Sequence, residues 1–115
     1  MQLRDDLLKD ISARNSRLGS LAFDLLNKAN DEINDYKKIG DVRSKSTRLT
    51  TLIRRRDIIQ SLKDAIDKIA DKYIEQVTQA DSNEHLKKLR TEMESENAQI
   101  EISLHKTKTE METIA

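Results

Sequence analysis

Eight basic residues between positions 37 and 56 form the group in this 115-residue chain that is best suited to bind a charged ligand. They are Lys37, Lys38, Arg43, Lys45, Arg48, Arg54, Arg55 and Arg56. Asp41 is the only acid among them, so the local balance is +7 (8 − 1), although the whole chain is neutral. Ammonium and guanidinium groups at this density attract phosphates and carboxylates, which makes the basic run a candidate binding surface.

Three kinds of external partner are compatible with the basic run. Nucleic-acid phosphates could bind its cations, with the serine and threonine hydroxyls between positions 44 and 51 as further donors. An anionic membrane surface could bind it as a basic amphipathic helix with Leu49, Leu52 and Ile53 on the apolar side. The third is a protein with an acidic face. The run has no recognition-helix pattern and no interleaved aromatic residues, so we favour protein over nucleic acid.

The alternative to an external partner is ion pairing inside the molecule. A fold-back of the chain near residue 40 would bring the acids at positions 31, 32 and 35 opposite Lys45 and Arg48. A second fold-back, near residue 81, would bring Glu110 and Glu112 opposite the arginines of the run. Exposed pairs of this kind are worth only about 0–1 kcal/mol each, so they would organise the surface more than stabilise the fold.

The pattern of apolar residues changes within the basic run. Counting back by sevens from Ile69 reaches Leu62, then Arg55 and Arg48, so two arginines occupy positions expected to face a core. The neighbouring apolar residues at positions 49, 52 and 53 are then predicted to lie roughly 100° around the helix from that core, because each residue is rotated by about 100° from the one before it. A buried arginine without a partner is very costly, so these arginines either pair with an acid or lie where the bundle opens. We favour the second alternative.

The candidate partner-binding surface therefore combines an apolar centre with a basic rim. Its predicted residues are Lys45, Arg48, Leu49, Leu52, Ile53, Arg54, Arg55 and Arg56.

The sequence contains no pattern that indicates catalysis or metal binding. His85 and His105 are twenty positions apart, and neither belongs to a His-x-x-x-His or Glu-x-x-His helix motif. There is no cysteine, no phosphate-binding glycine loop and no nucleophile motif. We therefore expect a protein that is not an enzyme and has no cofactor and no metal.

Composition predicts an all-α fold. Charged residues make up 37% of the chain and aromatic residues 3%, with two glycines and no proline. Strand-rich folds need frequent turn residues and β-branched or aromatic runs, which are lacking here. The N-terminus has no signal-peptide core, and no apolar run approaches the ~18 residues of a membrane span. We expect a soluble, cytoplasmic (intracellular) protein without a transmembrane segment.

Two turn signals divide the chain into three long helices, predicted at residues 3–39, 42–79 and 83–115. Gly40 and Asp41 form a helix stop followed by a new helix start, and Asp81 with Ser82 offers a second helix N-cap. Short connections make neighbouring helices antiparallel. The expected architecture is one domain, residues 1–115, folded as an up-down-up bundle of coiled-coil-like helices. The rival is an open hairpin that completes its core by dimerising.

The apolar stripes of the first and third helices define the expected core. In the first helix the stripe comprises Leu7, Ile11, Leu18, Ala22, Leu25, Ala29, Ile33 and Tyr36, several of them eleven positions apart. In the third helix it comprises Leu86, Leu89, Met93, Ile100, Leu104, Met111 and Ile114. Polar residues at Asn15, Asn97 and Thr107 interrupt the stripes, and the asparagines are predicted to set the register of the helices.

The functional expectation is a non-enzymatic helical interaction or scaffolding module that contacts a partner through the basic 37–56 face. The expected partner is another protein with an acidic face, or a second copy of the chain. The alternatives are binding of nucleic acid or an anionic membrane surface through the same run, and a self-assembling structural coiled coil.

Overall fold

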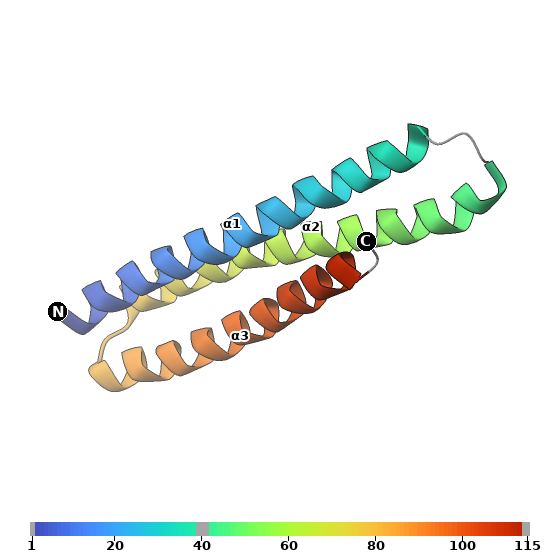
Figure 1. Cartoon of the computed structure of the whole chain (residues 1–115). Helices are drawn as coiled ribbons and strands as arrows, with labels where there is room; N and C mark the ends of the chain where they lie inside the picture. Colours follow the sequence, from blue (N-terminus) through green and yellow to red (C-terminus); the bar gives the residue numbers. More distant parts are fainter. Residues whose placement is uncertain (1, 39–41, 114–115) are drawn as a thin grey trace.

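Three long helices follow from a chain without proline, and they pack side by side (Figure 1). The computed structural model describes the backbone of residues 2–38 and 42–113 and the side chains of residues 3–38 and 48–112. Helix α1 spans Gln2–Lys38, α2 spans Val42–Gln79 and α3 spans Asn83–Thr113. The predicted all-α, up-down-up three-helix bundle is confirmed, with an elongated shape of 62 × 17 × 17 Å.

The connection between α2 and α3 is held by side chains from both sides. The Ser82 hydroxyl accepts a hydrogen bond from the backbone N–H of His85 at 3.1 Å, as a helix N-cap does. At the other side of the turn, α2 has no basic residue in its last turn. Arg4 of α1 takes that role by donating hydrogen bonds to the carbonyls of Val77 and Ala80. The predicted cap at Gly40 and Asp41 lies outside the described residues.

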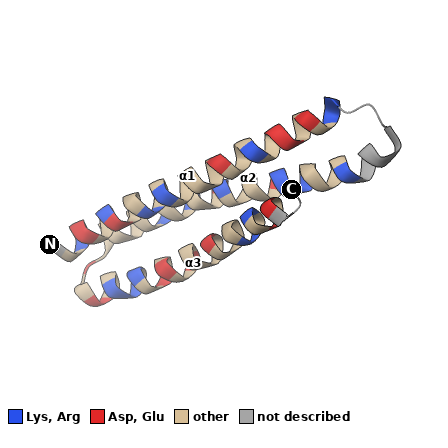
Figure 2. Cartoon of the chain, viewed as in Figure 1, with Lys and Arg blue, Asp and Glu red and all other residues tan. Residues whose placement is uncertain are grey.

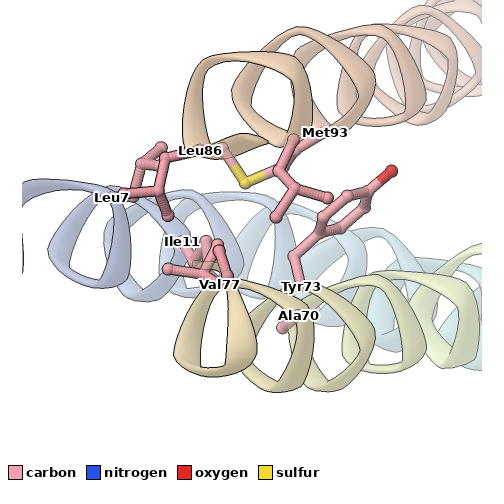
Figure 3. Close-up of a cluster of buried hydrophobic side chains, with 9 residues drawn as sticks. Leu7, Ile11, Ala70, Tyr73, Val77, Leu86 and Met93 are labelled. Atoms are coloured by element: carbon pink, nitrogen blue, oxygen red, sulfur yellow. The ribbon is translucent and has the colours of Figure 1, made fainter. Parts of the chain in front are cut away.

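The core of the bundle is built mainly from the predicted stripes. Every apolar residue predicted in α1 from Leu7 to Ile33 is at most 3% exposed, and Tyr36 is half-buried. The stripe of α3 is also buried as far as Met111, while Ile114 lies outside the described residues. Figure 3 shows one cluster of this core, to which all three helices contribute side chains. The ring of Tyr73 belongs to this cluster, and its hydroxyl points away from the labelled apolar side chains.

The hydroxyl of Tyr73 connects the core to a polar group on α3. Glu96 accepts a hydrogen bond from this hydroxyl, which is the main reason that the pKa of Glu96 is lowered. The Lys72 ammonium lies 3.1 Å from the same carboxylate and 4.9 Å from the centre of the Tyr73 ring. Burial, followed by this hydrogen bond, raises the pKa of Tyr73. The three side chains tie the C-terminal part of α2 to α3.

A polar layer separates two apolar clusters of the core. One cluster includes Ile11 and Met93, and the other includes Leu18 and Ile100. Asn15 and Asn97 occupy the positions between them and line a common cavity of about 10 Å³. Neither amide has a hydrogen-bond partner within the described part of the chain. The two amides therefore form a polar layer without direct protein partners between the two apolar clusters.

The prediction that α2 loses its core phase within the basic run is wrong at Leu52. This side chain is 3% exposed. Counting by sevens from Leu52 reaches Ile59, Ile66, Tyr73 and Ala80, all of which are buried. The reference residue of the prediction, Ile69, lies in a flanking row and is only half-buried. The central row therefore continues through the arginines without a break, and Leu52 belongs to the core.

The central row of α2 should dominate the stability of the bundle. Replacing Ile66, which is 2% exposed, with Ala should lower the free energy of unfolding by about 2–5 kcal/mol, because apolar contacts are lost and a cavity remains. Replacing Ile102, which is 62% exposed, with Ala should change it by less than about 0.5 kcal/mol. Urea unfolding followed by circular dichroism measures both. Equal losses in the two variants would contradict the assignment of the core.

The polar layer should favour one register at the expense of stability. The Asn97→Leu variant should raise the free energy of unfolding by about 1–3 kcal/mol, because an amide without a protein partner is removed from the core. It should also broaden the amide signals in a heteronuclear NMR spectrum as alternative alignments become populated. Asn34→Leu, at an exposed position of α1, is the matched control. A loss of stability on Asn97→Leu would show instead that water fully satisfies the amide.

Candidate functional site

The described part of the basic run lies along the first half of α2. There α1 and α2 extend beyond the last described turn of α3, so this end of the molecule has two helices rather than three (Figure 1). We call the described residues of this end, 30–38 of α1 and 48–53 of α2, the hairpin tip. Figure 2 shows that basic and acidic positions are interspersed along all three helices. Acidic positions therefore occur along the same helices as the cations, and each cation has to be considered separately.

Arg55 is the buried cation of the group. It is 8% exposed, and its Nη1 lies 3.5 Å from a carboxylate oxygen of Glu32 on α1. The expectation that a core-facing arginine pairs with an acid of the first helix is therefore met at Arg55. The preferred alternative, that the bundle has opened at this point, is wrong for Arg55. The acid at position 32 therefore pairs with Arg55, one of the alternatives that the sequence left open.

The other arginines of α2 differ in their surroundings. Arg56 is half-buried and pairs with Asp57, its neighbour in the chain, at 3.2 Å. Arg48 is half-buried and Arg54 is exposed, and neither has an ion-pair or hydrogen-bond partner among the described residues. The side chain of Lys45 lies outside the described residues. Of the predicted cations with described side chains, Arg48 and Arg54 are thus the two without an acidic partner.

The apolar centre of the predicted surface is smaller than expected. Leu52 is buried inside the bundle and cannot contact a partner directly. Leu49 and Ile53 are half-buried and lie one helical turn apart. Arg56 continues the same stripe, three residues after Ile53. What remains at the surface is a narrow apolar stripe bordered by arginines.

A cavity of about 220 Å³ opens between α2 and the C-terminal part of α3. Its lining residues are Thr51, Arg54, Arg55, Ile58, Thr107 and Glu110. Sequence reasoning placed Glu110 opposite the arginines, but missed Ile58 and Thr107. The signal for Ile58 was an apolar residue just outside the stripe, and in the structure it is 55% exposed. No pattern in the sequence indicated that these side chains surround one hollow.

The two histidines do not line this cavity, and each lies close to an acid four residues earlier in the chain. His85 lies 3.8 Å from Asp81, and His105 lies 3.8 Å from Glu101, each within its own turn of the chain. Both side chains are exposed. Within residues 3–38 and 48–112, no cluster of three or more His, Cys, Asp or Glu side chains could hold a metal ion. No helix in the described ranges is long and apolar enough to cross a membrane.

Comparisons with protein-family models, with curated proteins and with solved structures each find no match to this chain.

The pair of Arg55 and Glu32 should respond asymmetrically to mutation. Arg55→Leu should be neutral or slightly stabilising, because an apolar side chain fits the buried position and Glu32 can be hydrated once its partner is lost. Glu32→Leu should cost about 1–3 kcal/mol, because it leaves a buried guanidinium without its acceptor. Chemical denaturation of both variants measures the difference. A larger loss for Arg55→Leu than for Glu32→Leu would mean that the aliphatic part of the arginine, rather than its charge, supports the packing.

Proposed function

We propose that the protein is a non-enzymatic helical interaction module and that it binds an acidic protein partner through the arginine side of α2. The observation that carries this proposal is the pair of available cations, Arg48 and Arg54, in a molecule whose other described arginines on α2 already have acidic partners. Arg48 directly precedes the half-buried Leu49 in the chain, and Arg54 directly follows the half-buried Ile53. An apolar centre with a charged rim is the usual composition of a protein interface.

The charge of the hairpin tip, taken together with Arg54, Arg55 and Arg56, supports a protein partner over nucleic acid. Residues 30–38 and 48–56 carry six basic and three acidic side chains, a balance of +3 (6 − 3). Nucleic-acid binding draws on many phosphate contacts from an uninterrupted basic surface. Here Asp31 and Asp35 are exposed at the same end of the molecule. An acidic partner can place its carboxylates at individual arginines and avoid these acids.

Photo-crosslinking tests which class of molecule binds. A photoreactive amino acid replaces Ile53 at the hairpin tip, and in a control protein it replaces the exposed Ile102 of α3. After irradiation in the native cells, adducts are separated and identified by mass spectrometry. We expect a discrete protein adduct from position 53 that position 102 does not form. The Arg48→Glu and Arg54→Glu substitutions together should abolish it, because they remove both available cations.

Matched variants make this experiment decisive. Arg56→Glu should leave the adduct largely intact, because Arg56 is already paired with Asp57. Arg55 is left unchanged, because reversing a buried charge would disturb the fold. Circular dichroism checks that every variant keeps its helicity. An adduct with nucleic acid, an adduct with a second copy of the chain, or a protein adduct that survives the double reversal would each overturn the proposal in favour of an alternative.

A further inference from the structure

The cavity between α2 and α3 is the part of the proposed interface whose shape and donors specify a ligand group. We propose that it binds one carboxylate side chain of the acidic partner, held by the guanidinium groups of Arg54 and Arg55. This inference rests on the proposed function for the identity of the partner, but the binding chemistry of the cavity is tested independently of it.

The donors of the cavity come from two successive arginines. A guanidinium carries five N–H groups, and the contact of Arg55 with Glu32 involves only Nη1. No fully buried side-chain nitrogen or oxygen in the described ranges lacks a hydrogen-bond partner, so the unused N–H groups of Arg55 reach solvent, and Arg55 lines the cavity. Arg54 has no partner of its own and lines the same cavity. Two guanidinium groups in reach of one site are suited to a planar, bidentate carboxylate.

The other lining residues limit what can bind. The hydroxyl of Thr107 donates its hydrogen to the backbone carbonyl of Ser103 at 2.9 Å, so this oxygen offers no hydrogen to an anion. Ile58 is exposed at the cavity and can contact the methylene groups of a bound side chain. The volume, about 220 Å³, is below the roughly 300–1,000 Å³ of pockets for small molecules. Space and contacts thus suit an amino-acid side chain.

Glu110 limits the affinity of the cavity for anions. It is the only acid among the residues that line this cavity, and it is exposed. Its repulsion of a bound anion grows in proportion to the charge of that anion. The attraction of Arg54 and Arg55 grows in the same proportion, so the preference for a carboxylate side chain over phosphate rests on the methylene contacts with Ile58, which phosphate lacks. Glu110 also lowers the affinity for any anion, so neutralising it should strengthen binding.

The first experiment titrates the full chain with N-acetylglutamate amide, which presents a single side-chain carboxylate. The arginine Nε–H signals in an ¹⁵N-resolved NMR spectrum report directly on the two guanidinium groups. We expect saturable shifts for Arg54 and Arg55 and none for Arg56. The Arg54→Gln variant should weaken binding about tenfold, the effect of losing one charge-assisted contact worth about 1.4 kcal/mol. Glu110→Gln should strengthen binding about threefold, a screened charge effect at a partly exposed site.

Two neighbouring residues provide controls of the same type. Arg56→Gln and Glu112→Gln remove the same kinds of charge two positions after Arg54 and Glu110. Neither Arg56 nor Glu112 lines the cavity, so both variants should bind like the unmodified chain. Inorganic phosphate, titrated in a second arm, should bind more weakly than N-acetylglutamate amide. Tighter binding of phosphate, or equal effects of Arg54→Gln and Arg56→Gln, would overturn the inference. Because Glu110 is exposed, the Glu110→Gln variant should keep the fold. It therefore tests the cavity even if Arg54→Gln alters the fold.

The outcome separates this inference from the proposed function. If N-acetylglutamate amide binds as expected but no protein adduct forms at position 53, the carboxylate site stands and the proposed function falls. If the adduct forms but Glu110→Gln and Arg54→Gln leave the NMR titration unchanged, the interaction stands and the cavity is not its anchor.

Discussion

The bundle depends on one row of side chains along α2, spaced by seven from Leu52 to Ala80, which is buried along its whole length. Helix α2 is the only element joined by short connections to both of the others, so its buried row must pack against two neighbours at once. A seven-residue spacing keeps such a row on one side of the helix over many turns. The burial of this row sets the rotation of α2, and that rotation decides which of its remaining residues face solvent.

Polar residues within the core specify the alignment of the helices. Asn97 and Thr107 of α3 are buried, and Asn97 shares a cavity with Asn15 of α1. Apolar layers can slide past one another at little cost, whereas moving an amide into an apolar layer costs the free energy of burying a polar group. Ion pairs at the surface favour the same alignment of the helices. Arg14 and Arg17 of α1 contact Glu94 and Glu101 of α3, which fixes the same offset between these two helices from outside the core.

The candidate site is a consequence of this alignment. The rotation of α2 buries Leu52 and brings Arg55 against Glu32, and it leaves Arg54 on the side that faces the end of α3. The offset of α3 then places Glu110 and Thr107 opposite Arg54 and Ile58, so that a cavity forms between them. A shift of one turn, about 5.4 Å, would bring a different set of side chains to this place. The alignment that the polar layer favours is therefore also the alignment that forms the cavity, although the two lie in different parts of the molecule.

The sequence by itself determined the helices, their ends within two residues where they are described, and nearly all of the core of α1 and α3. These features depend on local chemistry, such as the N-cap at Ser82, and on a helical period that can be counted along the chain. Only the tertiary structure decided that Leu52 is core, that Glu32 serves Arg55, and that Ile58 and Glu110 line one cavity. Counting by sevens along α2 could start from either of two apolar rows, and the sequence of a single helix does not show which row is central. The choice of partner depends on the relative rotation and offset of two helices, which are fixed by the packing of the whole bundle.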